Sequence, residues 1–227
     1  MKAAALIAAA SLLAVAAWQV TQTDDASTDT GGAWGGELLG SADQILTNAG
    51  QSAAQFVDTI TMGTFRLSNM AAVTSADLQN ANVQALLKVI RKGEGTSDAG
   101  GYSRLFGGGS FASFADHPRT KVTRTMGGKP ITSSAAGAYQ FLTSTWDETA
   151  RLMGLTDFSP AAQDLGAVGR IAARGALDDA KAGRFDLAIQ KIASEWASMP
   201  GSPYGQPVIS LASARAIFAT HGGTRTA

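Results

Sequence analysis

Cysteine is absent from the 227 residues, which excludes disulfides, thiolate metal sites and a cysteine nucleophile. Histidine occurs only as His117 and His221, and their spacing is not that of a metal site. The chain also lacks a phosphate loop ending in Gly-Lys-Ser/Thr and a Gly-x-Ser-x-Gly nucleophile turn. The remaining chemistry is that of a carboxylic acid, and we expect no metal or other cofactor.

Net charge is also absent, because 18 basic residues balance 18 acidic ones, but the two signs are unevenly distributed. Residues 1–80 hold seven acidic and two basic residues, whereas residues 81–227 hold sixteen basic and eleven acidic ones. This asymmetry indicates two parts with different roles. A mildly basic second part suits a polyanionic partner such as nucleic acid or the bacterial wall. An ordinary solvated surface is the alternative.

The N-terminal segment, residues 1–20, is apolar and rich in alanine, with Lys2 before the uncharged run and Asp24 and Asp25 after it. Its length matches a membrane span over residues 3–20. The flanking charges predict a transmembrane or signal-anchor segment with its N-terminus inside and its C-terminus outside. A signal peptide that is cleaved after small residues, followed by secretion, is the alternative.

Three further parts follow along the chain. Residues 21–36 are rich in Gly, Asp and Thr and are typical of a linker. Residues 37–73 carry apolar residues at helical spacing but no chemical motif, which predicts a helical extension that acts as a spacer or docks on a partner. Residues 74–227 form the predicted main domain.

The main domain has the pattern of an α+β, helix-dominated fold. Apolar residues between Val83 and Ile90 lie on one helical face, and Gly93 is a typical stop. A glycine-containing turn between KVTRT and PIT predicts a small hairpin. Ser159 and Pro160 form a cap and first-turn pair. We expect helices over 138–153, 160–174, 185–196 and 209–220.

Glu94 is the candidate catalytic acid. It follows the first strong helix, lies between two glycines, and is the only acidic residue from Asn80 to Ser97. The helix dipole and an apolar cleft raise the pKa of such a carboxyl, as a general acid requires, although Arg91 and Lys92 act in the opposite direction. The alternative is an exposed loop charge without function.

Six segments in one order give the sequence a family resemblance. They are GEGT (93–96), SFASFADHPR (110–119), SSAAGAYQFLTSTWD (133–147), MGLTDFSPAAQD (153–164), RGAL (174–177) and EWASMPGSPYGQ (195–206). Over about residues 80–223 the chain closely resembles the lambda-phage endolysin family, which are lytic transglycosylases with a lysozyme-like fold.

The resemblance implies cleavage of the β-1,4 bond between N-acetylmuramic acid (MurNAc) and N-acetylglucosamine (GlcNAc) in peptidoglycan. Glu94 matches the family's essential glutamate, which protonates the leaving oxygen. The 6-hydroxyl of the muramic acid then closes a 1,6-anhydro ring, so no second carboxylate is required. Gly93 departs from the family's serine at this position, and Arg91 and Lys92 replace more apolar neighbours.

The resemblance also implies substrate-binding residues. Tyr139 and Gln140 match cleft residues, with core packing as the alternative for Tyr139. Tyr204 and Gln206 resemble rim residues, and His117 lies in a loop that matches the family's flap over the cleft. Asp116 in the same loop is expected to form a bracing salt bridge. Trp146 and Trp196 occupy apolar helical positions and are expected in the core.

The predicted function is that of a phage peptidoglycan lytic transglycosylase acting in wall penetration or host lysis. We expect it to be anchored in the host inner membrane or a virion membrane, with other virion proteins as candidate partners of residues 37–73 and no nucleic acid partner. A muramidase is the first alternative, and it requires a carboxylate opposite Glu94, for which Asp98 and Asp116 are candidates. The second is a non-catalytic wall-binding or structural virion protein.

Overall fold

The computed structural model describes residues 65–126 and 128–226. The chain divides into two compact units, Met1–Gly63 and Thr64–Ala227. Residues 65–73, which we assign to the extension from sequence, therefore belong to the second unit. The predicted membrane segment, the linker and the rest of the extension lie outside the described residues. Within the described part, no helix is both long enough and apolar enough to cross a membrane.

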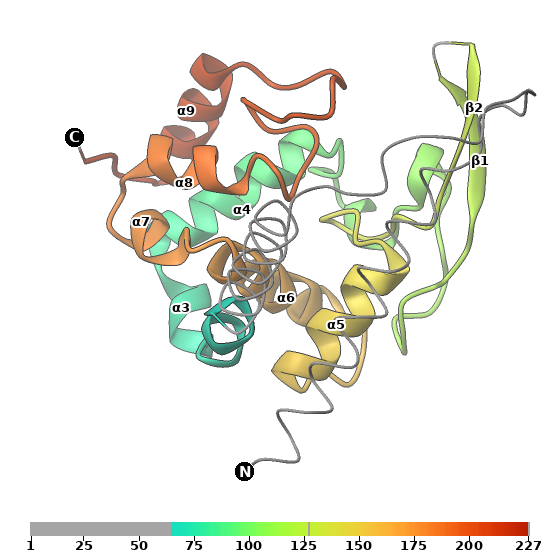
Figure 1. Ribbon diagram of the computed structural model, residues 1–227, viewed down its shortest axis with the longest axis horizontal. Coiled ribbons are helices and arrows are strands. Elements are labelled where there is room, and N and C mark those ends of the chain that lie inside the picture. The colour runs from blue at the N-terminus through green and yellow to red at the C-terminus, as the bar shows by residue number, and fades with distance from the viewer. Residues whose placement is uncertain (1–64, 127, 227) are drawn as a thin grey trace, which may run out of the picture. The chain divides into compact units, whose positions relative to one another are not determined.

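The second unit is built mainly from helices, with a small two-stranded sheet at one side (Figure 1). Residues 65–71 are helical. The helices that follow are α3 (Ser75–Gln79), α4 (Ala81–Gly93), α5 (Thr143–Met153), α6 (Pro160–Ala173), α7 (Leu177–Lys181), α8 (Phe185–Ile192) and α9 (Leu211–Thr220). Two short 3-10 turns, η1 (Gly101–Ser103) and η2 (Phe106–Gly108), lie between α4 and the sheet.

Helix α4 is the central element of the unit. Its first turn is capped by Asn80, whose side-chain oxygen accepts the backbone N–H groups of Asn82 and Val83 at 3.0 and 3.2 Å. It packs against α3, α6, α7 and α9 (Figure 1), and its apolar residues are buried over more than one face: Val83, Ala85, Leu86, Leu87, Val89 and Ile90. A helix enclosed in this way presents its C-terminal end in a fixed position.

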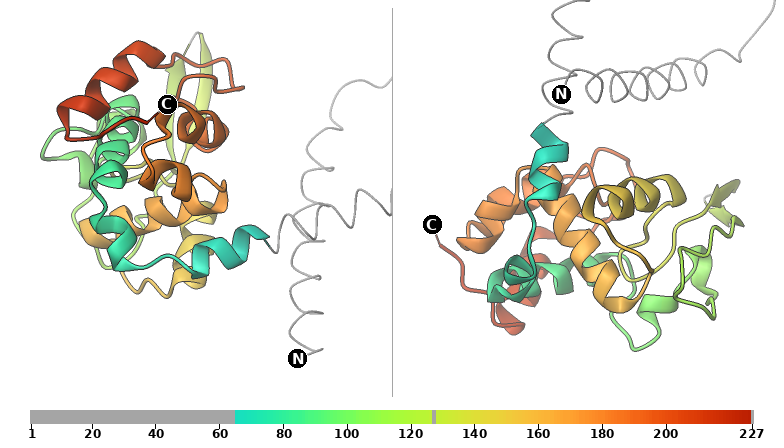
Figure 2. Two further views of the ribbon diagram at one scale, coloured as in Figure 1. Left: turned by 90° about the vertical axis from the view of Figure 1, so that its left-hand side faces the viewer. Right: turned by 90° about the horizontal axis from the view of Figure 1, so that it is seen from below.

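The predicted hairpin is confirmed. Strand β1 (Val122–Met126) pairs antiparallel with β2 (Lys129–Ser133), with Val122 opposite Ser133 and Met126 opposite Lys129. Most of its residues are exposed, and the view from below shows it projecting from one side of the helices (Figure 2). The helix-dominated fold with one small sheet is therefore as the sequence predicts.

The predicted helix over 138–153 begins later than expected. A tight turn closes between Ala136 and Phe141, whose backbones exchange hydrogen bonds of 3.0 and 2.8 Å. Within it Gln140 has φ = 48°, which an α-helix does not accommodate. Helix α5 consequently starts at Thr143.

Other helix ends follow the sequence more closely. Ser159 caps α6 by accepting the N–H of Ala162, with Pro160 in the first turn as predicted. Helix α8 ends at Ile192, short of the predicted Trp196, because residues 193–195 tighten into turns. Helix α9 starts at Leu211, since Ser210 caps it.

The core extends from α4 into an aromatic cluster beneath α5 and α6. Trp146 is buried as expected, with its ring 4.6 Å from that of Phe158 and 5.2 Å from that of Phe141. Trp196 is also buried, and its indole N–H donates to the carbonyl of Tyr139 at 3.1 Å.

One fully buried amide, that of Gln163 on α6, joins three loops. Its Oε1 accepts the N–H of Ala138 at 2.8 Å, and its Nε2 donates to the carbonyls of Tyr102 and Phe158 at 3.0 and 2.8 Å. Gly137 is required beside it, because a Cβ there would lie 2.3 Å from Gln163 Oε1. These bonds fix the turn at 136–141 against α6.

Replacing Gln163 by leucine keeps the volume but leaves these three backbone groups without partners. We expect Gln163→Leu to lower the free energy of unfolding by about 3 kcal/mol or more. The matched control is Gln190→Leu on the exposed face of α8, for which we expect a change within about 0.5 kcal/mol. Urea denaturation followed by circular dichroism measures both, and equal stabilities would contradict the role of the amide.

Candidate active site

Glu94 occupies the C-cap position of α4. Its backbone N–H still donates to the carbonyl of Ile90 at 2.9 Å, so the residue is fixed to the helix end. Gly95 follows with φ = 69° and turns the chain away. The side chain is partly buried, which excludes the alternative of a freely exposed loop charge.

The carboxyl of Glu94 has one side-chain partner, Ser198, among the described residues. Ser198 Oγ donates to Glu94 Oε1 at 2.6 Å. Burial raises the pKa of the Glu94 carboxyl above its ordinary value, while the hydrogen bond from Ser198 acts in the opposite direction. A carboxyl in this state holds its proton to higher pH than a free glutamate, which suits proton donation.

Gly93 permits the approach between α4 and the segment that carries Ser198. A Cβ at position 93 would lie 2.5 Å from Ser198 Oγ and 2.4 Å from Met199 Cε. Both distances are far below van der Waals contact. The departure from the family's serine at this position therefore has a structural correlate in this chain, the space taken by Ser198 and Met199.

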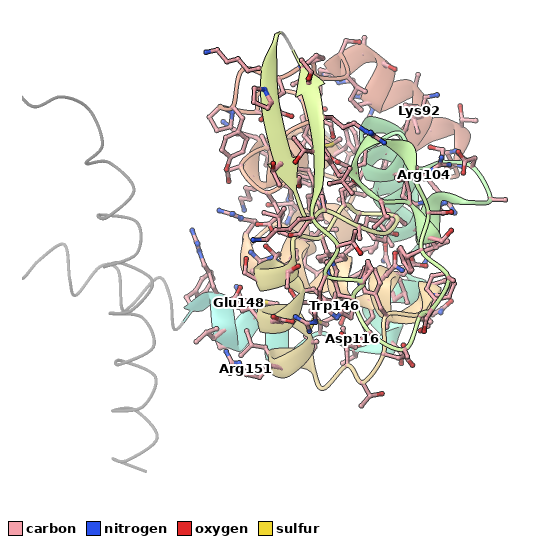
Figure 3. All side chains as sticks on the ribbon, turned by 90° about the vertical axis from the view of Figure 1, so that its right-hand side faces the viewer. Lys92, Arg104, Asp116, Trp146, Glu148 and Arg151 are labelled. Atoms are coloured by element: carbon pink, nitrogen blue, oxygen red, sulfur yellow. The ribbon has the colours of Figure 1, made fainter. Side chains whose placement is uncertain are left out.

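Arg91 braces the loop after Glu94 from behind. Its guanidinium is buried, and it donates to the carbonyls of Thr96 and Asp98 at 2.9 and 3.3 Å. It also donates to the hydroxyl of Tyr102 at 3.3 Å and lies 4.4 Å from the centre of that ring. Lys92, by contrast, is exposed (Figure 3).

Thr96 joins the same loop to the 136–141 turn. Its side chain is fully buried, and Oγ1 donates to the carbonyl of Ala138 at 2.5 Å. Gln163 on α6 also binds this 136–141 turn. The loop after Glu94 is therefore connected to α6 through buried hydrogen bonds. The position of the carboxyl thus depends on residues from several distant segments.

Tyr139 is placed in the core and not on a sugar-binding surface. It is 2% exposed, and its hydroxyl donates to Asp164 Oδ1 at 2.6 Å. Tyr102 donates to the same carboxylate at 2.8 Å, and burial together with Asp164 raises the pKa of Tyr102 to about 12. A buried ring offers no face for stacking on a sugar, so core packing, the alternative for Tyr139, describes this structure.

His117 is also buried, which argues against direct substrate contact. Its Nε2 lies 2.9 Å from the carbonyl of Phe141, and its Nδ1 accepts the N–H of Arg119 at 3.1 Å. Burial lowers the pKa of the imidazole, in keeping with a neutral ring that donates from Nε2 and accepts at Nδ1. The ring fixes the loop at 116–119 to the 136–141 turn.

The remaining predicted binding residues are more accessible. Gln140 is partly buried, and its side-chain amide donates to the carbonyl of Gly137 at 2.9 Å. Tyr204 is 56% exposed, with its hydroxyl donating to the carbonyl of Ser194 at 2.8 Å, and Gln206 is exposed in the same loop. These three residues keep surface available to a ligand.

The two carboxylates considered as partners for Glu94 are engaged by arginines. Asp98 forms a salt bridge with Arg104 at 2.6 Å. Asp116 forms one with Arg119 at 3.0 Å, which is the bracing pair expected from sequence. Within residues 65–126 and 128–226, no cluster of three or more acidic or histidine side chains is arranged to hold a metal ion.

Ser198 is the site residue that the sequence does not reveal. It lies within the EWASMPGSPYGQ segment, but 104 residues separate it from Glu94, and a serine in a loop carries no pattern of its own. The weak indication in the sequence is the glycine at position 93, whose lack of a side chain points to a close neighbour.

Comparisons with known proteins identify the family of the chain. A family model described as "Endolysin" matches residues 84–225. The endolysin of Escherichia phage lambda is 37% identical over 151 residues, covering 64% of this chain and 94% of that protein. The endolysin of Escherichia phage P2 is 36% identical over 157 residues, covering 63% of this chain and 93% of that protein.

Solved structures give the same result for the fold. Bacteriophage lambda lysozyme in complex with a chitohexasaccharide superposes with a TM-score of 0.60 at 36% identity, covering 65% of this chain and 97% of that one. A second structure of lysozyme from bacteriophage lambda gives a TM-score of 0.58. The chain therefore belongs to the endolysin family, and its second unit has a lysozyme-like fold.

Proposed function

We propose that this protein is a peptidoglycan lytic transglycosylase that cleaves the MurNAc-β-1,4-GlcNAc bond with Glu94 as the general acid. The observation that carries the proposal is the partly buried Glu94 carboxyl, with its raised pKa, at the rigid end of α4. Membership of the endolysin family supports a substrate in the bacterial wall. The similar lysozyme that is bound to a chitohexasaccharide supports a glycan ligand.

The proposed reaction needs one acid and no water. Glu94 donates its proton to the glycosidic oxygen, and the bond from that oxygen to C1 of the muramic acid breaks. The muramic acid's 6-hydroxyl oxygen bonds to C1 and passes its proton to the Glu94 carboxylate. The products are a 1,6-anhydromuramic end and a free hydroxyl on the glucosamine, and the acid is restored. The nucleophile belongs to the substrate, so its effective concentration is high.

The main alternative is a muramidase that hydrolyses the same bond with water. Such enzymes place a second carboxylate across the bond from the acid. Here Asp98 is bound by Arg104 and Asp116 by Arg119. These ion pairs favour the transglycosylase, in which neither carboxylate is needed.

Delivery to the wall is a separate part of the proposal. The apolar residues 3–20 support a membrane anchor with the catalytic unit outside, in the host inner membrane or in a virion membrane. Cleavage of the segment followed by secretion is the alternative. The segment of residues 37–73, which belongs to the acidic N-terminal part of the chain, suits docking on other virion proteins during entry. Host lysis is the other setting. The mass of the mature protein distinguishes a retained segment from a cleaved one.

Replacing Glu94 by glutamine removes the proton that the reaction requires. We expect Glu94→Gln to lower the rate of wall clearing by roughly 10²- to 10⁴-fold. Turbidity of purified peptidoglycan measures the rate. Asp98→Asn and Asp116→Asn are the controls, and we expect both to retain the activity of the wild type, since the ion pair that each weakens is exposed.

The same variant separates catalysis from folding. A raised pKa in the folded state means that stability contributed by the protonated form is lost as the pH rises through that pKa. At neutral pH, Glu94→Gln is therefore expected to melt at the same temperature as the wild type or higher. Clearing at the wild-type rate by this variant would favour the non-catalytic wall-binding protein.

The reaction products distinguish the two enzymes directly. We expect 1,6-anhydromuropeptides, because the 6-hydroxyl attacks in place of water. Mass spectrometry of digested walls detects them as lighter by one water than the hydrolytic products. Muropeptides with reducing muramic ends would show a hydrolase, while leaving Glu94 as its acid.

The pH dependence follows from the protonation state of Glu94. Because the protonated form is the active one, we expect the clearing rate to fall as the pH rises through the pKa of Glu94. Burial raises that pKa, so the midpoint should lie above that of a free glutamate. Rates on purified walls across a buffer series measure it, and a rate that increased through this range would contradict the assignment of Glu94 as an acid.

A further inference from the structure

We infer that Ser198 is a positioning residue for Glu94, whose hydroxyl fixes the orientation of the catalytic carboxyl. The inference rests on the proposed function of Glu94 as the general acid. It assigns a second group to the proton transfer, contributed by the segment after α8.

The hydrogen bond from Ser198 distinguishes the two oxygens of the Glu94 carboxyl. A protonated carboxyl has one acceptor oxygen and one O–H group. Ser198 Oγ donates to Oε1 at 2.6 Å, which is a short hydrogen bond for two oxygens. The acidic proton is therefore placed on Oε2, and the hydrogen bond restricts rotation of the carboxyl group.

Ser198 is itself held in place by its surroundings. It is 9% exposed, and its carbonyl accepts the N–H of Ile209 at 3.0 Å. The next residue, Met199, is fully buried and donates its N–H to the carbonyl of Trp196 at 3.0 Å. Trp196 is bonded in turn to the Tyr139 carbonyl. The serine hydroxyl thus stands on a turn that is anchored in the core.

On the helix side of this bond, Gly93 packs closely against Ser198 and Met199. Gly93 faces Ser198 Oγ and Met199 Cε at distances that exclude a Cβ. The absence of a side chain at position 93 and the hydroxyl at position 198 are therefore parts of one arrangement. A methyl group at 93 would displace the hydroxyl from Glu94 without changing either reacting residue.

The bond also acts on both states of the acid. Burial alone disfavours the ionised form, and a donor hydroxyl favours it. When Glu94 has given up its proton, Ser198 stabilises the carboxylate until the 6-hydroxyl of the substrate returns a proton. Without the hydroxyl the acid would ionise at higher pH and its orientation would be less restricted.

The test compares Ser198→Ala with the wild type on purified peptidoglycan. We expect kcat to fall by roughly tenfold, which corresponds to one hydrogen bond to an ionisable group, with KM unchanged. We also expect the falling limb of the pH profile to move to higher pH. Ser198→Thr keeps the hydroxyl and should return the limb towards its wild-type position.

Two further variants make the result specific. Gly93→Ala should move the limb in the same direction as Ser198→Ala, although the serine is still present. Ser194→Ala removes another serine hydroxyl and is the control. Ser194 accepts the hydrogen bond of Tyr204 with its backbone carbonyl, which the substitution keeps, so the pH profile of this variant should match that of the wild type. If Ser198→Ala is too unstable to assay, Gly93→Ala decides the question.

The outcomes separate this inference from the proposed function. A pH limb that does not move in Ser198→Ala or Gly93→Ala overturns the positioning role, whatever the loss of rate. A limb that moves while the products carry reducing ends supports the role of Ser198 and rejects the transglycosylase. Full activity in Glu94→Gln rejects the assignment of Glu94, and the inference with it.

Discussion

The close contact between the end of α4 and the turn at 196–199 is the constraint on which the site depends. Gly93 lies against Ser198 and Met199 with no room for a side chain, and the adjacent Glu94 meets the Ser198 hydroxyl. Helix α4 is enclosed by four other helices, so its end cannot retreat. The carboxyl is therefore held in a partly buried position, where the loss of water disfavours its charged form.

Burying an acid in this way requires rigid surroundings, and the fold supplies them with polar bonds as well as apolar packing. Arg91 holds the loop after Glu94 by its carbonyls, Thr96 joins that loop to the 136–141 turn, and Gln163 joins the turn to α6. Each of these side chains is buried, so each bond is costly to break. These connected hydrogen bonds stabilise the surroundings of the acid and so offset the cost of burying its carboxyl.

Local patterns were sufficient to predict α4, α6 and the hairpin, because caps, helical periodicity and turn residues act within a few positions of each other. They failed where distant contacts decide. The predicted start of α5 was wrong, because the pairing of Ala136 with Phe141 holds Gln140 in a conformation that a helix excludes. The sequence around Tyr139 is the same whether the ring packs in the core or binds a sugar, and only its burial in the fold shows that it packs in the core. Ser198 was missed because its partner is 104 residues away.

Other charged groups near Glu94 in the sequence are engaged in contacts of their own. Arg104 forms an ion pair with Asp98, and Arg119 forms one with Asp116. Arg91, which is buried, donates to backbone carbonyls and to Tyr102. The shift in the pKa of Glu94 comes from burial, which raises it, and from the hydrogen bond of Ser198, which lowers it. In the proposed transglycosylase the substrate supplies the nucleophile, so the reaction requires from the protein only this acid and the hydroxyl that orients it.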